Sequence, residues 1–211
     1  MTTREQFAEK RGESVKKALE ARGFEAYYCA TGAEAKELAL SLIEEGSSVS
    51  WGGSVTIREI GLTEAVNNGN YRAIDRDKAA CPEEKDKLHH EGLLADYYLT
   101  STNGISEDGE LINVDGTGNR VAAMVFGPKH VIVVAGINKI SRTAEDALTR
   151  VRTVAAPLNH FRVPGKTPCT ETGVCADCKS PACICNQILI TRNCRPAGRV
   201  KVILVGEELG F

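Results

Sequence analysis

The sequence has little net charge and no long apolar run. Its 26 lysine and arginine residues nearly balance 28 aspartate and glutamate residues, which gives a formal net charge of −2. Without a basic block, nucleic-acid binding has no electrostatic support. No stretch reaches the roughly 20 consecutive apolar residues that cross a bilayer. Residues Met1–Gln6 are polar and lack the features of a secretory signal peptide. We therefore expect a cytoplasmic protein that binds neither nucleic acid nor membranes.

Proline and cysteine are scarce outside one segment. Five of the seven prolines and six of the eight cysteines lie between Pro157 and Pro196. A segment with so many prolines cannot be regular helix or strand throughout. We predict that residues 157–196 form an excursion, organised by what its cysteines bind, within a single α/β domain over residues 1–211.

Strand-like and helix-like patterns alternate along the rest of the chain. The expected strands lie at 24–30, 49–51, 71–74, 96–101, 110–114, 130–135 and 199–205, and the expected helices at 3–22, 33–45, from 55 onward, 83–94, 119–125 and 141–154. The run His130–Ala135 is nearly all apolar, which is typical of a central strand covered on both faces. This alternation predicts a three-layer α/β fold with a largely parallel sheet.

The cysteine spacing predicts a metal site. The run reads C-x5-C-x2-C-x4-C-x-C-x8-C, with cysteines at Cys169, Cys175, Cys178, Cys183, Cys185 and Cys194. Thiolates suit zinc and iron–sulfur clusters, and disulfides are disfavoured in the cytoplasm. We choose Cys169, Cys175, Cys178 and Cys185 as ligands. Cys183 and Cys185 are one residue apart, so in an extended segment they point in opposite directions and only one joins the same site.

Other interpretations of the cysteines stay open. They could be free thiols, or Cys175 and Cys178 could form a redox disulfide. The spacing lacks the second C-x2-C pair of a zinc ribbon, and it matches neither common ferredoxin pattern. An iron–sulfur cluster of the 4Fe–4S type is slightly favoured, and zinc is the rival. Cys183 or Cys194 could replace one of the chosen ligands.

A glycine-rich turn offers a possible anion site. At Trp51–Thr56 a strand ends, two glycines permit a tight turn, and a helix starts. Backbone amides and the helix dipole at such a turn favour phosphate or carboxylate. An ordinary turn with Ser54 as the helix cap fits equally well. The candidate ligand-binding residues here are Gly52, Gly53, Ser54 and Thr56.

Polar residues also gather around positions 101–104 and 113–120. The candidate ligand-binding residues there are Asn103, Asp115, Gly116, Gly118, Asn119 and Arg120. Arg120 either clamps an anion through two hydrogen bonds or forms a structural ion pair. Lys139 follows an apolar strand at the edge where α/β sheets bind ligands, although an exposed loop lysine also fits. The histidines form no motif, and no catalytic residue can be assigned.

Several of these segments together resemble the LUD-domain family, which includes the C subunit of bacterial lactate-utilization complexes. The similar segments are Trp51–Leu62, Asn103–Gly109, Asn113–Ala123 and Gly127–His130. Within the family, the chain is most similar to a stand-alone subgroup with a cysteine-rich C-terminal tail. That tail corresponds here to Thr172–Pro181, Ile184–Asn186 and Val202–Phe211.

The resemblance implies a fold similar to ribose-5-phosphate isomerase, glucosamine-6-phosphate deaminase and CoA transferases. In that superfamily the glycine loop and the neighbouring strand ends hold phosphate or acyl ligands. The resemblance thus implies that one pocket is bordered by Gly52, Gly53, Ser54, Asp115, Asn119 and Arg120. It transfers no activity, because one fold hosts many chemistries. The partner subunit of the lactate complexes carries its own cluster-binding cysteines in a different spacing.

Three functions follow as hypotheses. The leading one is a LUD-type protein of organic-acid redox metabolism, on an acid such as lactate, with a small-anion pocket and a four-cysteine metal site. The first rival is a non-redox enzyme acting on a phosphorylated or acylated metabolite, with structural zinc. The second is a non-enzymatic ligand-binding or assembly subunit. The implied partners are a small anionic metabolite and either a second copy of the chain or a redox partner protein.

Overall fold

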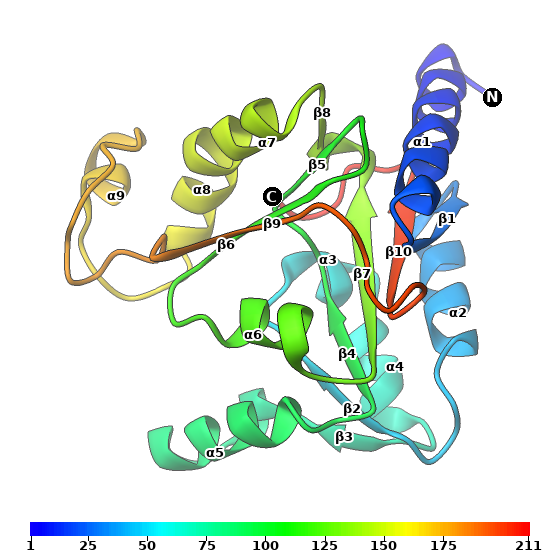
Figure 1. Cartoon of the computed structure of the whole chain (residues 1–211). Coiled ribbons are helices and arrows are strands. Elements are labelled where there is room, and N and C mark those ends of the chain that lie inside the picture. The colour runs from blue at the N-terminus through cyan, green and yellow to red at the C-terminus, as the bar shows by residue number, and fades with distance from the viewer.

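The computed structural model describes residues 1–211 and is built on a six-stranded sheet in which every pair of neighbours is parallel (Figure 1). The strand order is β1 (Glu25–Cys29), β10 (Val200–Val205), β7 (His130–Gly136), β4 (Tyr97–Thr100), β2 (Ser48–Trp51) and β3 (Arg72–Ile74). The last strand of the chain, β10, pairs with both β1 and β7. The predicted three-layer α/β fold with a parallel sheet is confirmed.

Strand β7 shows why this sheet needs cover on both faces. Its side chains alternate, so that Val131 and Val133 join one buried cluster while Ile132 and Val134 join another. All four are fully buried. A strand with two dry faces must be apolar at every position, as the sequence predicted for this run.

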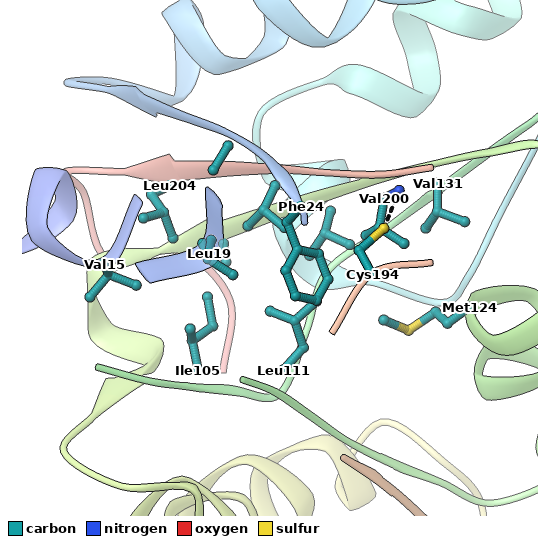
Figure 2. Packing of buried hydrophobic residues seen from close by; sticks show 14 of the residues in the cluster. Val15, Leu19, Phe24, Ile105, Leu111, Met124, Val131, Cys194, Val200 and Leu204 are labelled. Carbon is teal, nitrogen blue, oxygen red and sulfur yellow. Dashed lines mark hydrogen bonds between the residues drawn. The ribbon is translucent and has the colours of Figure 1, made fainter. Parts of the chain in front are cut away.

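Helices and a second sheet supply that cover. The first face packs against α2 (Gly32–Ser41), α3 (Val55–Glu59) and α4 (Leu62–Asn68). The second packs against α1 (Thr3–Ala21) and α6 (Asn119–Phe126). Figure 2 shows Val15 and Leu19 of α1 in one cluster with Ile105 and Leu111 of the second sheet. Helix α5 (Pro82–Gly92) lies beside α6 and the β2–β3 edge of the sheet.

The second sheet was not predicted. Its order is β8 (Ile140–Ser141), β5 (Gly104–Ser106), β6 (Leu111–Asp115) and β9 (Gln187–Thr191). Strand β9 lies inside the cysteine-rich segment and pairs antiparallel with β6. It is an edge strand with Ile188 and Ile190 exposed, so its residues show no burial pattern that sequence periodicity could reveal. This pairing anchors the cysteine-rich segment to the rest of the fold.

The predicted helix at 141–154 starts later and ends later than expected. It comprises α7 (Ala144–Arg150), a π-helical segment (Val151–Ala155) and α8 (Ala156–His160). Pro157 removes one hydrogen bond from the helix, and the wider π-helical turn directly precedes it. The remaining short elements are the 3-10 turns at Arg76–Lys78 and Ile137–Lys139, and α9 (Pro168–Thr172). None of the helices is both long enough and apolar enough to traverse a membrane.

Candidate functional site

A polar cavity of about 580 Å³, called the basic pocket below, opens where four parallel strands end. Its wall includes Ser54 after β2, Arg76 after β3, Ser101 after β4 and Lys139 after β7. Segments that follow parallel strands meet at one edge of a sheet, which is where α/β proteins bind ligands. The basic pocket therefore lies where the fold favours a ligand.

Most of the candidate ligand-binding residues meet in this pocket. Those that line it are Gly53, Ser54, Thr56, Asn103, Asp115, Gly116, Asn119, Arg120 and Lys139. Gly52 and Gly118 do not line it. Gly52 approaches the Tyr98 hydroxyl and the Arg120 side chain, and Gly118 caps α6 with a left-handed φ of 89°. Two segments more than 40 residues apart in the sequence thus line one pocket, and whether this pocket binds a ligand stays a prediction.

Cations outnumber carboxylates around the basic pocket. The cationic residues are Arg58, Arg76, Lys85, Arg120, Lys139 and Arg162, and the acidic residues are Asp77 and Asp115. Lining charge of one sign raises the local concentration of ligands of the other sign. The pocket is therefore suited to an organic anion. Sequence reasoning missed the contributions of Arg58, Arg76 and Arg162, because isolated arginines in polar helices and loops carry no motif.

Lys139 is buried at the base of the pocket, contrary to the alternative of an exposed loop lysine. Its side chain is 3% exposed, and its Nζ donates to Thr56 Oγ1 and Ser101 Oγ, each at 2.9 Å. Burial, with smaller contributions from Arg150 and Arg120, lowers the pKa of Lys139 to about 7. No carboxylate lies within ion-pair distance of it. An incoming anion would supply the countercharge that the protein does not provide.

Arg120 forms a structural ion pair rather than a free clamp. Its Nε donates to Asp115 Oδ1 at 2.8 Å, and its Nη2 donates to Asn103 Oδ1 at 2.7 Å and to the Val114 carbonyl at 2.8 Å. Both side chains of the pair are largely buried. Arg120 therefore joins β6 to the loop after β4, and its contribution to anion binding is a prediction that this geometry does not require.

We expect Arg120→Met to destabilise the fold by about 3 kcal/mol or more, because it leaves a buried Asp115 carboxylate without its partner. The matched control is Arg72→Met, since Arg72 pairs with Glu91 on the surface. Exposed pairs contribute at most about 1 kcal/mol. Urea unfolding of both variants measures the difference. Equal small losses would mean that the Arg120 pair is energetically no different from a surface pair.

The glycine turn is shaped by Arg76 more than by a helix dipole. Helix α3 has only five residues, and Ser54 caps it by accepting from the Ile57 N–H at 3.4 Å. A Cβ at position 53 would lie 2.5 Å from Nη2 of Arg76. A side chain at position 53 would therefore displace the Arg76 guanidinium from its place over the turn. His89 contacts this arginine and Asn119 and belongs to the pocket wall.

A second cavity, called the cysteine cavity below, holds most of the clustered cysteines. It measures about 320 Å³, and its lining is mostly apolar. Five sulfur side chains border it, namely Cys169, Cys175, Cys178, Cys183 and Cys185. No three His, Cys, Asp or Glu side chains in the structure lie close enough together to hold a single metal ion. The donors surround a space rather than converging on a point.

Electrostatics in the cysteine cavity reflect this crowding of thiols. Burial, together with the nearby Cys183, Cys175 and Cys169, raises the pKa of Cys185 to about 12. Cys185 therefore stays protonated near neutral pH unless a metal binds it, because a metal deprotonates a coordinating thiol outright. The only cation among the lining residues, Arg152, already contacts Asp177.

The other three cysteines lie elsewhere. Cys194 is buried in the main core, where its Sγ accepts from the Val200 N–H at 3.3 Å (Figure 2). Cys29 is buried at the end of β1, and Cys81 is exposed at the start of α5. Cys194 is therefore not placed to replace one of the chosen ligands, whereas Cys183 lines the same cavity as they do.

The two cavities share a wall. Val114 of β6 and Ile184, which lies between two of the cysteines, line both. Next to them the Asn186 N–H donates to the Asp115 carbonyl at 2.8 Å, and Asn186 Nδ2 donates to the Gly116 carbonyl at 3.0 Å. The cysteine-rich segment is thus hydrogen-bonded to the strand end that borders the basic pocket. Sequence alone could not reveal this proximity.

The fold and its cavities define a three-layer α/β protein with a polar pocket at the carboxyl edge of its parallel sheet. The LUD domain model matches residues 12–205, and the chain therefore belongs to the LUD domain family. A DUF162 family protein from Deinococcus radiodurans, known from a crystal structure, is similar with a TM-score of 0.54 and 14% sequence identity. That likeness covers 94% of this chain and 98% of the other, and it shows the fold alone. No curated protein matches the sequence.

Proposed function

We propose that this LUD-family protein acts in organic-acid redox metabolism, with an anionic metabolite in the basic pocket and a metal centre in the cysteine cavity. The observation that carries the proposal is the wall shared by the two cavities, formed by Val114 and Ile184. A metal centre far from the pocket would serve only as a scaffold. One whose cavity shares wall residues with the pocket would lie beside a bound metabolite, which favours electron exchange between the two.

The donor set of the cysteine cavity suits a soft metal centre, because five thiols border one space of about 320 Å³. Cys169, Cys175, Cys178 and Cys185 would hold a 4Fe–4S cluster, which supplies one-electron transfer when bound.

The basic pocket supports an organic acid as the metabolite. Lys139, held by Thr56 and Ser101, would bind the carboxylate, with the excess of arginines attracting it to the pocket. The LUD family's link to lactate utilization suggests a 2-hydroxy acid or the corresponding 2-oxo acid. The pocket volume also has room for acids larger than lactate.

The electron balance of this proposal requires an external acceptor. Oxidation of a 2-hydroxy acid to a 2-oxo acid releases two electrons and two protons. The two protons would pass to water, and a cluster that carries one electron would have to be reoxidised twice by the acceptor. A redox partner protein that accepts single electrons would complete the reaction. Val174 and Ile188 are exposed apolar residues beside the cysteine cavity, and they would offer such a partner an apolar contact surface there.

Anaerobic purification, followed by a visible spectrum and by iron, sulfide and zinc analysis per chain, tests this proposal. We expect stoichiometric iron and sulfide with broad visible absorption that decreases when L-lactate or a related 2-hydroxy acid is added. Matched additions of acetate, which cannot be oxidised in this way, should leave the spectrum unchanged. A colourless protein with stoichiometric zinc would overturn the redox proposal.

A further inference from the structure

His160 is a buried histidine whose ring has no partner in the protein. It is the last residue of α8, its side chain is 2% exposed, and it lines the cysteine cavity. Neither its Nδ1 nor its Nε2 has a hydrogen-bond partner, and neither atom reaches solvent. Buried polar atoms are nearly always hydrogen-bonded, and each exception calls for an explanation.

The Thr167 hydroxyl and Arg152, which also line the cavity, already have partners of their own. The Thr167 hydroxyl lies 3.1 Å from Cys169 Sγ, and Arg152 contacts Asp177. Among the polar groups that line the cavity, His160 is therefore the one without a partner. A neutral imidazole carries one N–H donor and one acceptor nitrogen, so the ring places at least one donor without an acceptor in the lining of the cysteine cavity.

A metal centre would give that donor an acceptor. Sulfurs bound to iron carry negative charge, and hydrogen bonds to them are among the interactions that set the reduction potential of a cluster. We propose that His160 donates a ring N–H to a metal-bound sulfur in the cysteine cavity and thereby raises the reduction potential of the centre. This inference rests on the metal centre of the proposed function. The role is that of a tuning residue, because five cysteines line the cavity and four complete the cluster.

Potentiometric titration of the full chain, reconstituted anaerobically with iron and sulfide, tests the assignment. His160→Leu removes the donor, while His160→Asn and His160→Gln each place an amide N–H near one of the two ring positions. We expect all three to keep wild-type iron and sulfide content. The leucine variant should have a lower reduction potential, and one of the amide variants should recover part of the difference.

The control is His90→Leu, since His90 is exposed on α5 and distant in sequence from the cysteine-rich segment. It should leave the potential unchanged. His160→Met replaces the leucine variant if leucine does not fold, as judged by circular dichroism.

Three outcomes would overturn the inference. An unchanged reduction potential in the folded leucine or methionine variant would show that His160 makes no hydrogen bond that affects the centre. Loss of iron from that folded variant makes His160 a ligand and not a donor to sulfur. A wild-type chain that holds no iron refutes the proposed function itself, which distinguishes that failure from the first two.

Discussion

Replacing Cys175 with serine is expected to remove the metal centre from the anaerobically purified protein. Cys175 lines the cysteine cavity and lies near enough to Cys185 to raise the pKa of that thiol. A serine oxygen is a poor ligand for soft metals. Losing even an outer partner of a metal ligand costs roughly 10- to 100-fold in affinity, so losing the ligand itself should cost more. Iron per chain, measured after desalting, gives the result.

Two other cysteines provide matched controls for this experiment. Cys81→Ser changes an exposed residue that caps α5, where serine is a preferred cap, so both metal content and stability should stay at the wild-type level. Cys194→Ser should lower stability, since it alters a buried contact with Val200, yet keep the metal. If Cys175→Ser and Cys81→Ser retained equal amounts of iron, the chosen ligand set would be wrong.

The second large effect is expected at Lys139, whose protonation should make the affinity of the basic pocket for organic anions depend on pH. Because its pKa is lowered to about 7, the protonated fraction falls from about 0.9 at pH 6 to about 0.03 at pH 8.5. If the anion binds only the protonated lysine, its Kd should rise about 30-fold over this range. Calorimetric titration with pyruvate measures it, since the pyruvate carboxylate does not titrate in this range.

Lys139→Met should bind pyruvate weakly at pH 6 and lose this pH dependence. The control is Lys85→Met, because Lys85 lines the same pocket but is exposed, and this variant should keep the pH dependence. Wild-type affinity of Lys139→Met at pH 6 would exclude Lys139 from binding.

The same substitution should also change the pH dependence of stability in the absence of a ligand. The folded pKa of Lys139 lies below its unfolded value, so between about pH 7 and pH 10 the unfolded chain binds more protons than the folded chain. This group therefore makes stability rise with pH across that window, and its destabilising effect is fully present below pH 7. Lys139→Met should be more stable than wild type at pH 6 and should lack this rise. Urea unfolding of wild type and Lys139→Met at pH 6 and pH 8.5 tests the sign of this change in the free energy of unfolding.

Most of the parallel sheet was predictable from the sequence because its strands are buried on both faces. The run 130–135 is apolar at nearly every position, which is typical of a strand covered on both faces, and the segment 199–205 alternates before it ends in the apolar run 202–205. The short strands β5 and β9 were missed. Each depends on pairing with β6, and a strand of three residues or one with an exposed face has no periodicity of its own.

The candidate site was predictable in part for a related reason. Segments that follow parallel strands must meet at one edge, so Ser54, Asn103 and Lys139 could be grouped because each follows an expected strand. The burial of Lys139 and the pairing of Arg120 with Asp115 could not, because both depend on which segments fold over the pocket.

By itself, the sequence of this protein determined the α/β class, the parallel sheet and the presence of a cysteine-rich segment, since each leaves a local pattern of apolar residues, turns or spacing. Only the tertiary structure decided that five of those cysteines border one cavity, that His160 lines it without a partner, and that Val114 and Ile184 line both this cavity and the basic pocket. The physical reason is the pairing of β9 with β6. That contact joins residues more than 70 positions apart, and no local pattern encodes it.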